Sequence, residues 1–318
     1  MKKSVRAILT LVVLATLSIP AYSQVAPDLG TTSGFALFTG GGAFDSEGGT
    51  HITGDIASFT VTPIITSPGV VDGTIYTVGD GALNQPFLDL GALYDNLFSR
   101  TPTYNISVTL GGQTLTPGVH STGSGAAATL SGSLTFNANG NPNAVFIVQI
   151  DGALSVGSNT NVILTGGASA CNIYWQITGA FDLGSNSIFM GTVVGGGAIE
   201  LLYGATLYGR AFTKAGAIHL HNNKIVISNA PSASAGTDRT ICQYESTQLG
   251  APPVSGNTYS WTSLPAGFTS SEANPTVSPM VTTTYTLTDS SSASGCSGSN
   301  SVTVTVNPAP VTSLINHY

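Results

Sequence analysis

Asp182, Glu200 and His219 are the residues best suited to chemistry, because each ends a Gly-Ala-apolar-x motif that recurs at a nearly constant interval. If these motifs stack as strands, the three side chains form one column about 4.8 Å apart. His221 lies two positions further along and shares their face. Such a column offers a divalent-metal site or an acid–base pair. The more ordinary interpretation is a solvated surface on which Glu200 and His219 make a weak ion pair.

The composition narrows the possible functions. Charged residues make up 7% of the 318 residues, with 8 Lys+Arg against 15 Asp+Glu and a net charge of −7. So few cations cannot hold nucleic acid or an anionic membrane by charge. The hydrophobic content of 42% excludes a disordered acidic tail. With few groups able to do acid–base work, we expect a non-enzymatic protein that needs no metal and no other cofactor.

The amino terminus has the pattern of an export signal. Lys2, Lys3 and Arg6 precede a short apolar stretch, and a small-x-small cleavage pattern ends at Ser23. We therefore expect residues 1–23 to be a signal peptide and the mature chain, beginning near Gln24, to be secreted. No later stretch is long and apolar enough for a transmembrane helix, so no membrane partner is expected.

Repeats divide the mature chain. Motifs of the form Gly-x-apolar-x begin at Gly132, Gly152, Gly179, Gly197 and Gly216, and a second recurring strand lies between them. Two or three short strands in a period of about 19 residues predict a β-solenoid, in which each coil buries its apolar column against its neighbours. The longer interval from Gly152 to Gly179 predicts one insertion near positions 164–170.

One segment departs from this pattern. Apolar residues step by four, three, four and three, which predicts a helix that packs along one face of the solenoid. The stripe consists of Leu83, Phe87, Leu90, Tyr94 and Leu97, with Asp80 as its cap. Any binding surface is then expected on a face that the helix leaves free.

A second domain follows the polar segment 229–236, which we interpret as a linker. Residues 237–308 contain alternating Thr/Ser/Val strands, and Cys242, Trp261 and Cys296 have the spacing of a small β-sandwich with an inter-sheet disulfide. This segment resembles immunoglobulin-like modules related to polycystic-kidney-disease repeats, which implies a Cys242–Cys296 disulfide. Cys171 is then expected to be a buried small hydrophobe, and residues 309–318 a short tail.

Residues 28–228 resemble the bacterial and fungal ice-binding protein family, whose fold is a discontinuous β-solenoid with a flanking α-helix. The resemblance rests on segments in the family's order: Leu29-Gly30-Thr31, Ile52-Thr53-Gly54-Asp55-Ile56, Arg100-Thr101-Pro102, Leu115-Thr116-Pro117-Gly118-Val119, residues 141–147 and 170–176, and Gly209-Arg210-Ala211. It implies a mainly β protein that adsorbs to ice through a flat solenoid face. Thermal hysteresis and inhibition of recrystallisation are then expected, with ice as the partner of a monomer.

The resemblance also implies the contact residues. In the family a Thr-Ala/Gly-x-Thr/Asn element near a coil corner often lies on the ice-binding face. The corresponding residues here are Thr50, Ser158, Thr160, Ser185, Ser187, Tyr203 and Thr206.

Two other functions fit the same sequence. A β-helix polysaccharide lyase or hydrolase would use the acidic column as its catalytic group. A surface adhesin would use the solenoid to recognise carbohydrate and the second domain as a stalk. The sequence leaves open whether the corner residues or the column of Ser155, Asp182, Glu200 and His219 forms the contact surface.

Overall fold

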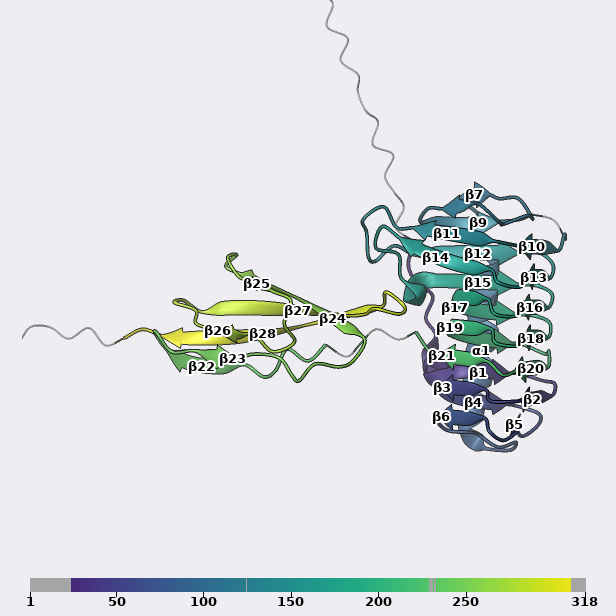
Figure 1. Cartoon of the computed structure of the whole chain (residues 1–318), viewed down its shortest axis with the longest axis horizontal. Coiled ribbons are helices and arrows are strands. Elements are labelled where there is room, and N and C mark those ends of the chain that lie inside the picture. The colour runs from purple at the N-terminus through teal and green to yellow at the C-terminus, as the bar shows by residue number, and fades with distance from the viewer. Residues whose placement is uncertain (1–23, 124, 229–230, 232, 310–318) are drawn as a thin grey trace, which may run out of the picture.

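The computed structural model describes residues 24–309 except 124, 229, 230 and 232. The predicted signal peptide lies outside the described residues, as do three positions of the predicted linker and residues 310–318 of the predicted tail. The described chain forms a β-solenoid followed by a smaller β domain (Figure 1).

The solenoid has three faces, built from parallel strands that pair between successive coils. The helix face contains β7 (Tyr104–Asn105), β9 (Gly118–Ser121), β12 (Phe146–Ile150), β15 (Ile173–Ile177), the second halves of β17 (Ile188–Gly195) and β19 (Thr206–Thr213), β1 (Phe35–Thr39) and β4 (Asp55–Ser58). The broad face contains β8 (Thr114–Leu115), β11 (Ser133–Asn137), β14 (Asn161–Thr165), the first halves of β17 and β19, β21 (Lys224–Val226), β3 (His51–Thr53) and β6 (Val70–Asp72). The short-strand face contains β10 (Ala128–Leu130), β13 (Leu154–Val156), β16 (Phe181–Leu183), β18 (Ile199–Leu201), β20 (Ile218–His221), β2 (Phe44–Glu47) and β5 (Ile64–Ile65).

Two long strands show how one coil passes from face to face. β17 and β19 bend from the broad face to the helix face at Gly191 and Gly209, both with positive φ. A Cβ at Gly209 would overlap the carbonyl oxygen of Gly191 in the adjacent coil. Only glycine allows both this backbone conformation and this approach.

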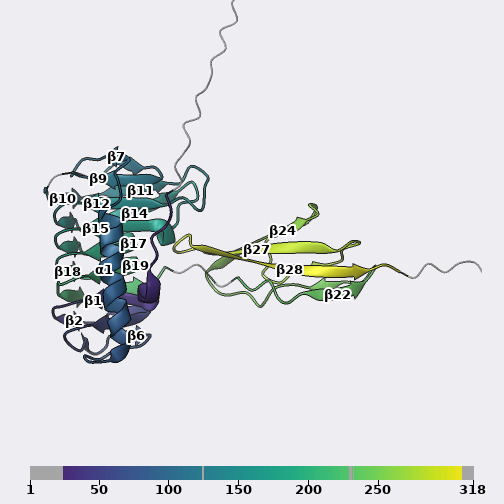
Figure 2. The same cartoon turned by 180° about the vertical axis from the view of Figure 1, so that it is seen from behind.

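The order of the coils is discontinuous, as predicted. The first strands of the chain stack below its last coil, with β1 on β19, β2 on β20 and β3 on β21. The chain then continues through α1 (Asn84–Phe98) to β7 at the far end of the stack, and later coils descend to meet the first (Figure 2). Short 3-10 helices η1 (Gly30–Gly34), η2 (Gly81–Leu83) and η3 (Ala170–Asn172) lie at bends.

The predicted helix is confirmed, with its buried stripe rotated slightly. Leu90, Leu93 and Leu97 pack on the outward side of the helix face, against residues such as Phe212. Phe87, predicted in the stripe, is 38% exposed, and Leu93 takes a buried place that the prediction missed. The Asp80 carboxylate accepts a hydrogen bond from the Ala82 amide and caps η2, one turn before α1.

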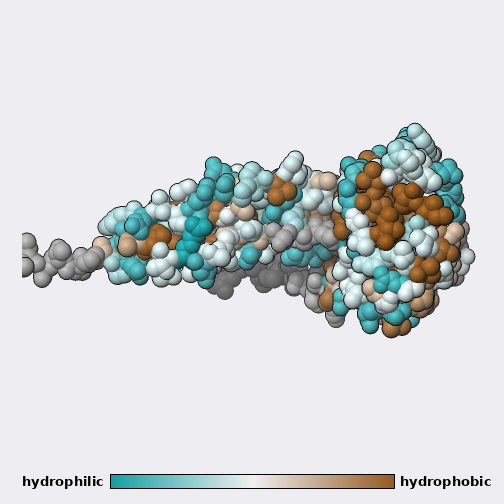
Figure 3. Space-filling model, turned by 90° about the horizontal axis from the view of Figure 1, so that it is seen from below, coloured by the Kyte–Doolittle hydropathy of each residue, from teal (hydrophilic) through white to brown (hydrophobic). Residues whose placement is uncertain are grey.

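The end of the solenoid near β5 and β6 is unusually apolar (Figure 3). Repeat proteins usually end in a coil with a polar outer surface. Here the exposed side chains of the outermost coil, near β5 and β6, include Val61, Ile64, Val70, Ile75 and Val78. Across the described residues, no helix is long and apolar enough to cross a membrane.

The second domain has a five-stranded sheet and a two-stranded sheet around a core that includes the fully buried Trp261. The large sheet follows the order β22 (Arg239–Cys242), β28 (Ser297–Asn307), β27 (Thr283–Ser291), β24 (Asn257–Leu264) and β25 (Thr269–Ser270). The small sheet pairs β23 (Thr247–Gln248) with β26 (Thr276–Val277).

The predicted Cys242–Cys296 disulfide is wrong. Cys296 is bonded to Cys171, while Cys242 is free and exposed. Cys171 lies at the end of the insertion between Gly152 and Gly179, and the adjacent Ala170 amide donates to the Ser294 carbonyl oxygen at 2.9 Å. The disulfide therefore joins the two domains, and Cys171 is not the unpaired buried residue that the sequence predicted.

This pairing predicts the alkylation pattern of the protein. Unreduced protein treated with iodoacetamide should gain one carbamidomethyl group, on Cys242, because the other two thiols are bonded. Mass spectrometry of tryptic peptides measures this. The Cys242→Ser variant, the control, should gain none before reduction, and a Cys242–Cys296 peptide would contradict the assignment.

Candidate functional site

A turn of constant geometry connects the short-strand face to the broad face in successive coils. Its second residue has positive φ in every case: Asn159, Asn186, Gly204, Asn222 and Gly48. In four of these five turns the amide of that residue donates to the carbonyl oxygen of the first turn residue in the next coil, as in Asn186 to Tyr203 at 3.0 Å and Asn222 to Glu47 at 2.9 Å. We call these segments the corner turns. Their stacking holds one row of side chains at each turn position.

The residue just before the broad-face strand of each corner turn points inward, which contradicts three of the predicted ice contacts. It is the third residue of four turns and, because Gly49 lengthens the turn that begins at Glu47, the fourth residue of that one. Thr50, Thr160 and Ser187 are 0%, 1% and 0% exposed. The Ser187 hydroxyl donates to the Gly157 carbonyl oxygen at 2.8 Å and accepts from the Thr160 amide at 3.0 Å. The Thr50 hydroxyl accepts from the Asn223 amide at 3.1 Å. Thr50 and Ser187 therefore satisfy buried backbone groups, and none of the three side chains can touch an external surface.

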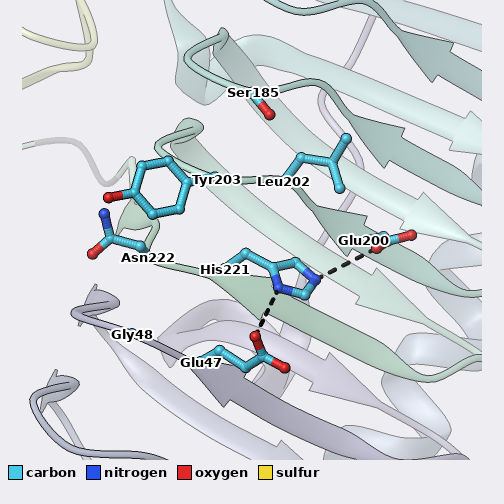
Figure 4. Close-up of a pocket in the computed structure, with 8 residues that line it drawn as sticks. All are labelled: Glu47, Gly48, Ser185, Glu200, Leu202, Tyr203, His221 and Asn222. Carbon is cyan, nitrogen blue, oxygen red and sulfur yellow. Dashed lines mark ion pairs between the residues drawn. The ribbon is translucent and has the colours of Figure 1, made fainter.

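The other four predicted residues lie on the outside but do not share one surface. Thr206 is the fourth residue of its turn and points outward at the start of β19 on the broad face. Ser158 is exposed at the corner itself. Ser185 and Tyr203 line a hollow on the short-strand side of the corner (Figure 4).

The broad face carries two regular outward rows. One row passes through the fourth turn residues, with Asn161 paired to Ile188 and Ile188 to Thr206. The other begins with Thr114, Thr135 and Ile163, which are paired in that order. Inward residues alternate with both rows and are buried, such as Val162 and Leu207. Each long strand thus contributes at least two outward side chains to a level array.

Charge divides the broad face into two parts. From β8 to β19 the outward strand residues are uncharged: Thr114, Ser133, Thr135, Asn137, Asn161, Ile163, Thr165, Ile188, Met190, Thr206 and Tyr208. We call this region the neutral half. Beyond it, Lys224 lies in register with Thr206, and His51 and Asp72 form a pair at 2.6 Å. The neutral half therefore has uncharged side chains, most of them small or branched, and no covering helix.

Sequence reasoning missed most of the neutral half because it chose the wrong position in the turn. Asn161 and Ile188 directly follow Thr160 and Ser187, and Ile163 is two positions beyond Asn161. The alternation of polar and apolar residues in 133–137 was the available signal, since it identifies the outward positions of that strand. In 161–165 three consecutive apolar residues conceal the same alternation.

The ionisable column exists on the short-strand face, in the predicted register. Asp182 pairs with Glu200, Glu200 with His219, and His219 with Asp45. His219 Nδ1 lies 2.8 Å from an Asp45 carboxylate oxygen, so its partner is Asp45 and not the predicted Glu200. Burial, together with the charge of Glu200, raises the pKa of Asp182. No group of three or more possible metal ligands occurs among the described residues.

A repeating solenoid with one level neutral surface defines a class of proteins that present ordered side chains to an extended partner. Residues 37–226 match the ice-binding-like family model. An ice-binding protein from Nostoc sp. (strain HG1) is 34% identical over 226 residues, covering 70% of this chain and 81% of the relative. One from Flavobacterium frigoris (strain PS1) is 32% identical, covering 63% and 76%.

Solved structures of ice-binding proteins are also similar to this chain. The crystal structure of an ice-binding protein from an Antarctic biological consortium matches with a TM-score of 0.61 and 34% identity, covering 70% of this chain and 96% of that one. The corresponding domain of a Shewanella frigidimarina ice-binding protein matches with a TM-score of 0.60 and 29% identity, covering 65% and 99%. The chain belongs to the ice-binding-like family.

Removal of one inward corner side chain should destabilise the solenoid. Asn223 is 2% exposed, donates to the carbonyl oxygens of Leu202 and Ala205, and accepts from the His221 amide. Asn223→Ala removes these three hydrogen bonds from a buried position and should lower the free energy of unfolding by about 2–4 kcal/mol. Calorimetry should show a melting temperature lower by roughly 5–15 °C. The exposed Asn161→Ala is the control, with a change within about 0.5 kcal/mol; equal losses would refute the inward role.

The raised pKa of Asp182 predicts that replacing this carboxylate with a neutral amide stabilises the folded state, and that the effect depends on pH. A carboxyl whose pKa is higher in the folded state loses stabilising free energy as pH rises through the interval between its unfolded and folded pKa values. Asp182→Asn should therefore raise the free energy of unfolding at pH 7, and with it the melting temperature. The gain is at most about 1 kcal/mol, because the carboxylate is only partly buried and solvent screens its charge. Below the unfolded pKa the difference should vanish. Asp45→Asn, which loses the contact with His219, should bring no gain; a gain there equal to that of Asp182→Asn would contradict this origin.

Proposed function

We propose that this protein binds ice through the neutral half of the broad face and thereby restrains crystal growth. The observation that carries the proposal is the level, uncharged, helix-free array from β8 to β19 on a family-specific solenoid. The relatives named as ice-binding proteins support it.

The side chains of this surface suit ordered water. Coils stack about 4.7–4.9 Å apart, so outward groups repeat regularly in two directions. Thr and Ile are stiff at χ1, and little rotamer entropy is lost when they meet a solid surface. Methyl groups favour an ordered water layer, while the hydroxyls of Thr135 and Thr206 tie that layer to the protein.

Adsorption through many weak contacts explains how the protein stops the growth of an ice crystal without catalysing a reaction. Bound molecules hold the crystal front at fixed points, and ice bulges between them. The curvature of each bulge lowers the local freezing point, which gives thermal hysteresis and slows recrystallisation. No cofactor takes part in this mechanism.

The export signal in the sequence and the disulfide between the domains support action outside the cell, where disulfides persist. The buried Trp261 between two sheets supports an immunoglobulin-like spacer as the role of the second domain.

Bulky substitutions on the two free faces distinguish the surfaces. Thr206→Tyr and Thr135→Tyr should reduce thermal hysteresis to roughly half or less, because each ring keeps neighbouring coils from the ice across several repeats of about 4.8 Å. Nanolitre osmometry of the full-length mature protein measures this. Ser155→Tyr, at an exposed position on the short-strand face, is the matched control and should retain activity.

Loss of thermal hysteresis in Ser155→Tyr, with activity retained in both threonine variants, would identify the short-strand face as the ice-binding surface. Circular dichroism melting of all three variants excludes unfolding as the cause of any loss. A well-folded wild-type protein that leaves growth rate and crystal shape unaltered would refute ice binding itself.

A further inference from the structure

A hollow of about 400 Å³ lies beside the proposed ice-binding surface, on the short-strand side of the corner turns. Its volume falls in the range of small-molecule sites. Side chains from four successive coils surround it, including Glu47, Ser185, Glu200, Leu202, Tyr203 and His221 (Figure 4). We call it the corner hollow. The ice-binding proposal makes no use of it.

The corner hollow has an apolar wall that is open to solvent. Tyr203 is 64% exposed and lies next to Leu202, so its ring and the leucine side chain together offer a flat apolar surface. Tyr203 is the first residue of its corner turn, and the next residue, the positive-φ Gly204, has no side chain that could crowd the ring. A ring in this position can stack on a flat ligand at little cost in conformational entropy.

The polar groups around this wall are available for hydrogen bonds. His221 lies between two carboxylates, 3.5 Å from Glu47 and 3.4 Å from Glu200, which is too long for strong hydrogen bonds. Within the described part of the chain, neither carboxylate accepts a hydrogen bond, and the hydroxyls of Ser185 and Tyr203 make none. The site therefore combines carboxylate acceptors with hydroxyl donors.

This combination suits a sugar ring, which has an apolar C–H face and a rim of hydroxyls. The C–H face fits on Tyr203, and the hydroxyls can donate to Glu47 and Glu200. The negative charge of these carboxylates, with Asp182 and Asp45 nearby in the same column, opposes an anionic ligand. We propose that the corner hollow binds a neutral or amino sugar, as the free ring or as a residue of a polysaccharide, and excludes uronic acids.

Saturation-transfer NMR and titration of the full-length protein test this site with four probes: glucose, glucosamine, N-acetylglucosamine and glucuronate. At least one neutral or amino sugar should bind, with glucuronate at least about tenfold weaker owing to the two carboxylates. Tyr203→Ala should weaken binding about three- to tenfold, which is the usual range for loss of an aromatic contact.

Two further variants make the result specific. Tyr244→Ala removes a tyrosine of similar exposure, 75%, on the second domain and should leave sugar binding unchanged. Glu47→Gln with Glu200→Gln should reduce the discrimination against glucuronate. Absence of binding by all three neutral and amino sugars, binding that survives Tyr203→Ala, or stronger binding of a lysine-rich peptide than of any sugar would overturn the proposal. Because ice activity is measured separately, either proposal can fail without the other.

Discussion

The backbone hydrogen bonds between successive corner turns are the interaction on which the other features depend. From Asn159 to Asn222 each positive-φ turn residue donates its amide to a carbonyl oxygen of the next coil, so successive turns repeat in both position and direction. A row of side chains is regular only because these bonds fix its backbone. The inward residues Thr50, Ser187 and Asn223 complete the same network by satisfying amides and carbonyls that water cannot reach.

The repeated turn also separates two surfaces that lie close together in the sequence. In the turn that begins at Tyr203, the first residue faces the short-strand side, the third is buried, and the fourth begins the broad face. Tyr203 and Thr206 therefore belong to one turn and yet face different surroundings. Charged side chains can collect in the column through Glu200 and His219 without disturbing the neutral half.

The sequence predicted the large features because they depend on periodicity. The nearly constant interval between the glycine motifs identified the solenoid, and the three-four spacing from Leu83 to Leu97 identified the helix. Periodicity did not predict which corner side chains point outward or which cysteine bonds to Cys296. Whether Thr160 or Asn161 points outward is decided by the positive φ of Asn159, which composition does not reveal. The partner of Cys296 is decided by where an insertion lies in space, and the spacing of Cys242 and Cys296 carried no such information.

That insertion shows how the solenoid gains a second domain without losing its regularity. In two later coils the corner between the broad and helix faces is made by Gly191 and Gly209 alone, whereas residues 166–172 form a loop at the same corner. The strands on either side keep their register, since β14 still pairs with β11 and β15 with β12 and β17. The loop thus places Cys171 beside Cys296 outside the stacked strands. Because the attachment lies at a corner, it leaves both free faces uncovered, and the surfaces proposed for ice and for sugar remain open to solvent while the second domain is held by a covalent bond (Figure 1).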